Sequence, residues 1–267
     1  DYYVCEAFAA AHRSAPSLIG FAEVLPTAGG RLFIEEFSAL STVKESPEHP
    51  CVYVLGGARI ADAFSMMKQV LATGTADKVL TSGLNGEVML LAQGYSLGAP
   101  TQGLIEEKGL TPYISQARDL LEQYGDKIEV PSDLAVVENG LRRELKLDEL
   151  PSEQLIVDIG QETIRRYIDF INTAATIFVN GPAGVYEKEE SAQGTARLWE
   201  AIAAAPGYSV IGGGDSVAAA GKFGVKDKMG YVCTSGGGMV RFLSGQELPV
   251  VTSLRRAAQR YSQKQPL

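Results

Sequence analysis

The residues best suited to chemistry are the glycines Gly212–Gly214 and the Asp215 and Ser216 that follow them, within YSVIGGGDSVAAAGKF. The apolar run 208–211 is typical of a buried strand, and the alanine-rich segment after Ser216 is typical of a helix. The first helical N–H groups lack intrahelical partners, the helix dipole is positive there, and glycine lets an anion approach. The stretch therefore predicts a phosphate-binding turn, with a tight strand-to-helix connection capped by Asp215 as the alternative.

The spacing of this stretch separates it from two common phosphate motifs. It has neither the lysine of G-x-x-x-x-G-K-[ST] nor the G-x-G-x-x-G fingerprint of dinucleotide folds. An NAD-dependent oxidoreductase is disfavoured, because no such fingerprint shares one βαβ unit with a ribose-binding acid.

Glycines also follow the other strands that we predict. They are Gly56, Gly57, Gly83, Gly181, Gly184 and Gly236–Gly238. Carboxyl ends of parallel strands share one edge of a sheet, where ligands bind, so these turns predict a bare backbone surface for a nucleotide. Turns that need a positive φ would explain some of these glycines, and they explain triplets less well.

Three charged side chains are predicted to lie at the same edge. Arg59 begins a helix, from where its guanidinium would reach a phosphoryl group; the alternative is an exposed arginine at the unfavourable end of the dipole. Asp215 would hold Mg²⁺ directly or through water. Glu187 would accept hydrogen bonds from ribose hydroxyls, or is simply solvated in its KEE surroundings.

The elements that position these residues alternate between strand and helix. We predict strands over 52–55, 78–80, 128–131, 176–179, 208–211 and 229–233, and helices over 31–43, 61–71, 87–93, 113–124, 161–173 and 189–205. The charge-rich segment 138–151 is predicted to be an exposed hairpin or loop. This alternation predicts an α/β fold: a three-layer, mostly parallel sheet with helices on both faces.

Composition limits the partners and the compartment. The 267 residues carry a formal net charge of -8, which argues against nucleic acid as a partner. Cys5, Cys51 and Cys233 form no C-x-x-C pair, so we expect free thiols in a reducing compartment, the cytoplasm. No apolar run approaches a membrane-spanning length, and the chain begins at Asp1, so we expect a piece of a longer protein without a membrane partner.

Six strings resemble phosphoglycerate kinase in their order along the chain. They are EAFAAAHR, LGGARIAD, VDIGQET, VNGPAGVYEKEESAQGT, VIGGGDS and TSGGGMVRFLSGQELPVV, and they span nearly the whole chain. The sequences around Gly56 and Gly83 are similar to those of archaeal members. The resemblance implies a Rossmann-like nucleotide-binding half of a monomeric, two-domain kinase, in which the other half binds the phosphoglycerate.

The resemblance also implies a division of the chain. Residues 1–30 would be a remnant of the substrate domain, 31–44 an interdomain helix, 45–252 the nucleotide-binding domain and 253–267 a returning segment. The implied reaction is phosphoryl transfer between 1,3-bisphosphoglycerate and MgADP, or between 3-phosphoglycerate and MgATP in reverse. Without most of the substrate domain we expect nucleotide binding but not full activity, and a stand-alone nucleotide-binding module is the alternative.

Residue roles follow from the resemblance by position. Adenine would meet Gly57, Ala58, Gly83, Leu155 and Val157; the nucleotide floor would be Asn180, Pro182, Gly184 and Val185; Glu187 would meet the ribose. The phosphates would meet Arg59 and Gly212, Gly213, Gly214, Asp215 and Ser216, with Mg²⁺ at Asp215. The catalytic set would be Arg59, Gly213, Gly214, Gly236, Gly237 and Gly238, and His12 and Arg13 would bind phosphoglycerate.

Two positions depart from the family pattern. Arg59 stands where the family motif GGAK has lysine, which keeps the charge and changes its shape and reach. Ser82 precedes Gly83 where the family commonly has a glycine pair.

Overall fold

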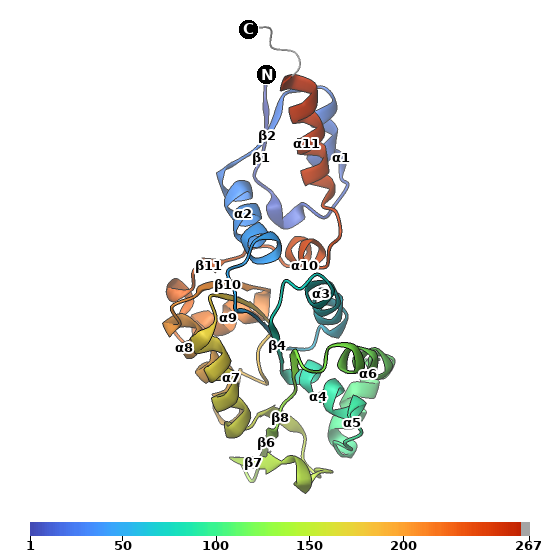
Figure 1. The fold of residues 1–267 in the computed structure, drawn as a ribbon, viewed down its shortest axis with the longest axis vertical. Coiled ribbons are helices and arrows are strands. Elements are labelled where there is room, and N and C mark those ends of the chain that lie inside the picture. Colours follow the sequence, from blue (N-terminus) through green and yellow to red (C-terminus); the bar gives the residue numbers. More distant parts are fainter. Residues whose placement is uncertain (263–267) are drawn as a thin grey trace.

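The computed structural model describes residues 1–262 of the chain. The molecule is elongated (Figure 1). The first residues and the last helix lie together at one end, the main α/β body lies in the middle, and a small antiparallel sheet lies at the other end.

The body is built on a six-stranded sheet in which every pairing is parallel. Its spatial order is β11 (Tyr231–Val232), β10 (Tyr208–Gly212), β9 (Thr176–Asn180), β3 (Cys51–Leu55), β4 (Lys78–Thr81) and β5 (Ile128–Glu129). Helices follow the strands, so the predicted α/β class with a parallel sheet is confirmed.

Alternate residues of each strand enter opposite cores. Tyr53 and Leu55 join one buried cluster, whereas Val52 and Val54 join the other. The first core is closed by α3 (Ile60–Ala72), α4 (Gly83–Ala92), α6 (Tyr113–Tyr124) and α10 (Gly237–Leu243), and the second by α7 (Gln161–Thr173), α8 (Gln193–Ala204) and α9 (Gly214–Lys222). Burial on both faces explains why the strands read as continuous apolar runs.

A smaller part forms around the N-terminus. It contains β1 (Tyr3–Cys5) paired in parallel with β2 (Thr27–Gly29), and the short helices η1 (Phe8–Ala10), α1 (Pro16–Ile19) and η2 (Gly20–Glu23). The last helix, α11 (Pro249–Ser262), packs on β2, α1 and η2, and α2 (Arg31–Glu45) leads into the body. Of the predicted returning segment, residues 263–267 lie outside the described residues.

The choice between hairpin and loop for 138–151 is resolved as a hairpin. β6 (Asp133–Glu138) pairs antiparallel with β7 (Leu141–Lys146) and with β8 (Ile156–Ile159). The short helix η3 (Leu147–Glu149) follows β7 in the chain. Asn139 and Gly140 turn the chain with φ of 52° and 77°. This sheet lies next to the body below α4 in Figure 1.

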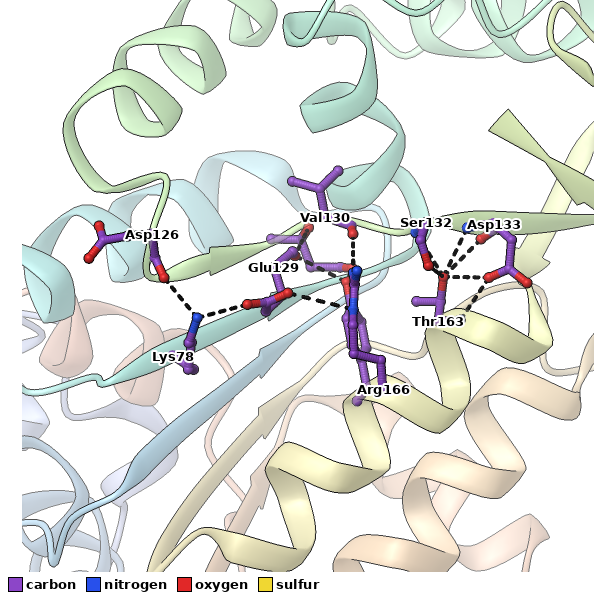
Figure 2. Close-up of polar contacts among 10 residues, drawn as sticks. Lys78, Asp126, Glu129, Val130, Ser132, Asp133, Thr163 and Arg166 are labelled. Atoms are coloured by element: carbon purple, nitrogen blue, oxygen red, sulfur yellow. Dashed lines mark hydrogen bonds and ion pairs between the residues drawn. The ribbon is translucent and has the colours of Figure 1, made fainter. Parts of the chain in front are cut away.

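Side-chain hydrogen bonds join this sheet to α7 of the body, and ion pairs lie beside them (Figure 2). The carboxylate of Asp133 accepts from the backbone N–H of Glu162 (2.9 Å) and of Thr163 (2.7 Å), and so caps α7. Nearby, Oε1 of Glu129 on β5 pairs with Lys78 Nζ (2.8 Å), and its Oε2 lies 3.6 Å from Nε of Arg166 on α7. The sheet edge, β6 and α7 are thus fixed to one another.

Several predicted elements have other bounds. The helix predicted over 87–93 begins at Gly83, since Asn85 is buried inside the helix rather than in a turn. The helix predicted over 189–205 is a 3-10 turn, η4 (Glu189–Ser191), followed by α8, and the strand predicted over 229–233 keeps only Tyr231–Val232 after η5 (Lys226–Lys228). Helix α5 (Ala99–Glu107) was missed, because Pro100 and Gly103 resemble a loop.

Two further findings concern the cysteines and the length of the apolar helices. Cys5, Cys51 and Cys233 are buried free thiols. No helix within residues 1–262 combines the length and apolar character that crossing a membrane requires.

Candidate functional site

The sheet has its topological switch point between β3 and β9. From β3 the chain continues outward through β4 and β5, whereas β9, β10 and β11 extend in the opposite direction. At their carboxyl ends the two turns touch: a Cβ on Gly56 would collide with the carbonyl oxygen of Pro182, and one on Gly181 with that of Gly56. Only glycine permits this approach, and a crevice forms where the turns diverge.

Hydrogen bonds fix the turns of four strands to one another. The N–H of Gly57 donates to the carbonyl of Pro182 (2.7 Å), and that of Gly83 to Ala183 (2.8 Å). Asn180 donates through Nδ2 to the Gly212 carbonyl (2.9 Å), and the N–H of Gly181 donates to Ser216 Oγ (2.7 Å). These bonds are made within the chain itself, so they fix the four turns relative to one another.

Asn85 completes this set of hydrogen bonds from inside α4. Its Nδ2 donates to the carbonyl of Gly56 (2.6 Å), and its side chain is buried. The sequence analysis did not select Asn85. The signal was present, because an asparagine within an otherwise apolar helical run implies a specific buried partner.

A small cavity of about 110 Å³ opens at the N-terminus of α9. From the predicted set it is lined by Gly57, Ala58, Arg59, Asn180, Gly213, Gly214, Asp215, Ser216 and Gly236; Asp62 also lines it. The residue before the helix is Gly213, with φ of 93°, a conformation that favours glycine. Backbone amides of the first turn of α9 therefore border the cavity.

The alternative interpretation of Asp215 as the helix cap is wrong. The cap position is Gly213, the helix begins at Gly214, and no side chain caps it. Asp215 lies within the first turn, is exposed and lines the cavity, and its negative charge interacts favourably with the positive end of the helix dipole.

Arg59 lies across the same cavity. It is exposed at the N-cap of α3, and the structure, over the residues it describes, gives its guanidinium no hydrogen bond or ion pair. A cation at the positive end of a helix gains nothing from the helix dipole. Its position is favourable only toward an anion.

A larger cavity of about 470 Å³ adjoins the first through Gly57, Ala58 and Asp215. Its predicted lining comprises Gly57, Ala58, Gly83, Leu155, Val157, Pro182, Gly184, Val185, Glu187 and Asp215. Leu84, Glu87, Leu104 and Ile156 also line it and were not predicted. Burial raises the pKa of Glu87 to about 8.

The loop carrying Glu187 is held at the mouth of this cavity. Lys222 Nζ donates to the carbonyls of Tyr186 (2.8 Å) and Glu187 (2.9 Å), and Ser191 Oγ donates to that of Val185 (2.6 Å). The Glu187 side chain remains exposed and borders the larger cavity.

Of the remaining predicted residues, some lie at the glycine triplet Gly236–Gly238, and others line neither cavity. The ring of His12 lies against the glycine triplet, since a Cβ on Gly237 would lie 3.0 Å from its Cε1 and Nε2, and Gly238 lies beside Ser235 and Phe8. Gly212 is covered by Met239 and lines neither cavity. Arg13 is exposed and lies outside both cavities, so the structure does not bring it together with the other predicted residues.

Asp215 is the carboxylate common to both cavities. In residues 1–262 no group of three or more His, Cys, Asp or Glu side chains is arranged to hold a metal ion. A single exposed carboxylate beside backbone amides fits Mg²⁺ that arrives with phosphate oxygens and water rather than a resident metal.

These features define an α/β protein with a ligand groove at the switch point of a parallel sheet. The chain belongs to the phosphoglycerate kinase family, a family of glycolytic kinases, whose sequence profile matches residues 1–246.

Relatives and solved structures agree with this assignment. The phosphoglycerate kinase of Methanothermus fervidus is 44% identical over 260 residues, 97% of this chain and 63% of that protein. That of Methanococcus maripaludis is 42% identical over 98% of this chain and 63% of its own length. The crystal structure of phosphoglycerate kinase from Pyrococcus horikoshii OT3 superimposes with a TM-score of 0.90 at 39% identity, over 97% of this chain and 65% of that chain. The chain thus spans less than two thirds of these relatives.

Proposed function

We propose that this chain is the nucleotide-binding half of a cytoplasmic, monomeric phosphoglycerate kinase. The observation that carries the proposal is the continuous groove, in which an apolar cavity joins a glycine-lined cavity with Arg59 and the N-terminus of α9. An apolar pocket suits a base, and a helix N-terminus suits phosphates. In this proposal residues 1–30 belong to the substrate domain, α2 joins the domains and 45–252 bind the nucleotide.

The larger cavity would hold adenine between Gly57, Gly83 and the apolar wall of Leu155 and Val157. Pro182, Gly184 and Val185 would form the floor, and Glu187, at the mouth, would accept from the ribose hydroxyls. The phosphates would then lie on the amides of Gly213 and Gly214, beside Asp215. Mg²⁺ at Asp215 would neutralise phosphate charge.

The reaction would transfer a phosphoryl group from the acyl phosphate of 1,3-bisphosphoglycerate to ADP. The bond from phosphorus to the carboxyl oxygen breaks, and a bond to the terminal oxygen of ADP forms, releasing 3-phosphoglycerate. Such a transfer needs alignment and neutralisation of charge rather than a protein nucleophile. Arg59 and the amides of Gly236–Gly238 would stabilise the phosphoryl oxygens in transit.

The phosphoglycerate side of the site is less complete in this chain. His12 borders the glycine triplet, and Arg13, with its exposed side chain, would meet the phosphoglycerate only when further residues close the cleft. We therefore expect nucleotide binding without efficient turnover by this chain alone. A nucleotide-binding module without kinase activity is the second candidate.

Calorimetric titration with MgADP, run beside a coupled kinase assay, tests the proposal. Arg59→Met should weaken MgADP binding about ten-fold, as expected from loss of a charge-assisted hydrogen bond. Arg118→Met is the matched control, since Arg118 is also exposed and lies on α6, outside both cavities.

The outcomes separate the candidates. Binding with no turnover, even after addition of a complementary substrate domain, favours the module. Turnover only after that addition supports the kinase half, and efficient turnover by this chain alone contradicts the expected dependence on the other domain. Absence of MgADP binding contradicts both candidates.

A further inference from the structure

Glu87 is a buried carboxyl group at the wall of the larger cavity. It lies on α4 one helical turn after Gly83, is only 6% exposed, and lines the cavity with Leu84, Leu104 and Ile156. Its Oε2 atom is buried without a hydrogen-bond partner.

Each of the other buried carboxylates of the described chain accepts at least one hydrogen bond, although Oδ1 of Asp158, like Oε2 of Glu87, is buried without a partner. Glu36 accepts from the N–H of Thr234 (2.7 Å), Asp133 from that of Thr163 (2.7 Å), and Asp158 from that of Gly194 (2.6 Å). A buried polar group without a partner costs free energy, so structural carboxylates find one in the fold. The unpaired state of Glu87 points to a partner from outside the chain.

Glu87 is a neutral acid at pH 7. Burial alone raises its pKa to about 8, with no contribution from a neighbouring charge. The charged residues that line the cavity, Lys108, Glu187, Lys188 and Asp215, are exposed, and Tyr186 is half-buried. A protonated carboxyl group offers one donor and one acceptor side by side.

Its place in the groove identifies the part of the ligand that it meets. Glu87 lines only the larger cavity, whereas the α9 N-terminus and Arg59 line the smaller one. A nucleotide with its phosphates at α9 therefore directs its base toward Glu87.

We propose that Glu87 is a specificity-determining residue that hydrogen-bonds the edge of the adenine base. Its hydroxyl donates to a ring nitrogen, and its carbonyl oxygen accepts from the 6-amino group. This inference rests on the proposed function, because it requires that a nucleotide bind in this groove.

A double-mutant cycle between the residue and the amino group tests the inference. The ligands are MgADP and the Mg²⁺ complex of purine riboside 5′-diphosphate, which lacks the 6-amino group. The variants are Glu87→Gln, which keeps a donor and an acceptor, and Glu87→Met, which keeps the shape and removes both. Affinities are measured by calorimetry at pH 6.5.

The wild type should prefer MgADP by about ten-fold, the expected value of one or two buried hydrogen bonds. Glu87→Gln should retain most of this preference, and Glu87→Met should bind both ligands equally. A purely structural residue would lower both affinities by the same factor. Lys108→Gln is the control, since Lys108 is an exposed residue of the same cavity and should leave the preference at its wild-type value.

Other results would contradict either the role of Glu87 or the binding of a nucleotide in this groove. If the wild type binds both ligands equally, the inference is wrong, and this measurement requires no variant to fold. If Glu87→Met keeps the preference, the amino group is recognised elsewhere and the inference is again wrong. If the wild type binds neither ligand, the proposed function is wrong, and the inference falls with it.

Discussion

At the scale of single residues, Glu87 makes the free energy of unfolding depend on pH. Its pKa in the folded protein is about 8, above the ordinary value of 4.5, so the folded state holds the proton more tightly than the unfolded state. The resulting stabilisation is complete below pH 4.5 and is lost as the pH rises toward 8. At pH 7 this proton linkage lowers the free energy of unfolding by about 3 kcal/mol relative to a side chain that does not ionise.

Glu87→Gln should therefore stabilise the protein increasingly as the pH rises. Urea unfolding of both proteins at pH 5 and pH 8 measures this difference, which should grow by about 3 kcal/mol between the two conditions. Glu187→Gln, at an exposed position of the same cavity, should show no such growth. An equal effect of Glu87→Gln at both pH values would mean that Glu87 is ionised in the folded state.

The residues that sequence could and could not identify differ in what defines them. Gly57, Gly83 and Gly213 are recognisable because a turn after a strand is a local feature. Glu87 is defined by its burial on α4, which packs against β8 from a distant part of the chain. Its type and its spacing from Gly83 were visible, but its missing partner was not.

At the scale of elements, the site depends on helix N-termini held in fixed positions. Helix α7 shows how this is achieved without a local cap: Gly160 provides no side chain, and Asp133 of β6 supplies the carboxylate instead (Figure 2). Thr163 Oγ1 also donates to Asp133 Oδ1 (2.6 Å). The cap therefore joins α7 to the antiparallel sheet whose β8 borders the larger cavity.

Asp133→Ala should lower the free energy of unfolding by about 2 kcal/mol, because it leaves the buried N–H of Thr163 and the partly buried N–H of Glu162 without partners. Denaturant unfolding measures the loss. Asp169→Ala, on the exposed face of the same helix, should have little effect. Equal losses in the two variants would show that the effect comes from helix composition rather than from the cap.

Sequence predicted the central strands and long helices because their apolar periodicity is local and strong. It did not predict α5, whose Pro100 and Gly103 are typical of loops, nor the break at Ala192 that separates η4 from α8. The pairing order of the strands, which creates the switch point, is a tertiary property that periodicity does not specify.

At the scale of the whole molecule, α2 connects the N-terminal part to the rim of the sheet. Glu36 of α2 is fully buried, and its carboxylate accepts from the N–H of Thr234 (2.7 Å) and from Cys233 Sγ (3.0 Å). These residues lead into the glycine triplet, on which His12 lies. The contact joins residues 198 positions apart, so no local pattern could have predicted it.

The position of this contact suggests what it does. The triplet Gly236–Gly238 has no side chains of its own to fix it, and Gly236 and Gly237 are exposed. Anchoring Cys233 and Thr234 to α2 keeps the triplet at the edge of the smaller cavity. Movement of α2 relative to the sheet would therefore move the triplet with it.

Glu36→Ala should release the segment from Thr234 to Gly238. It leaves the partly buried N–H of Thr234 without its acceptor, which should cost about 1 kcal/mol of stability and accelerate amide hydrogen exchange in this segment. The fold-change in MgADP affinity should be smaller than the fold-change in the amide exchange rate, because only Gly236 of the triplet borders the groove. Glu35→Ala, an exposed neighbour on α2, should leave exchange at its wild-type rate. Unchanged protection of the triplet in Glu36→Ala would show that α2 does not hold it, and that its position depends instead on packing against His12 and Phe8.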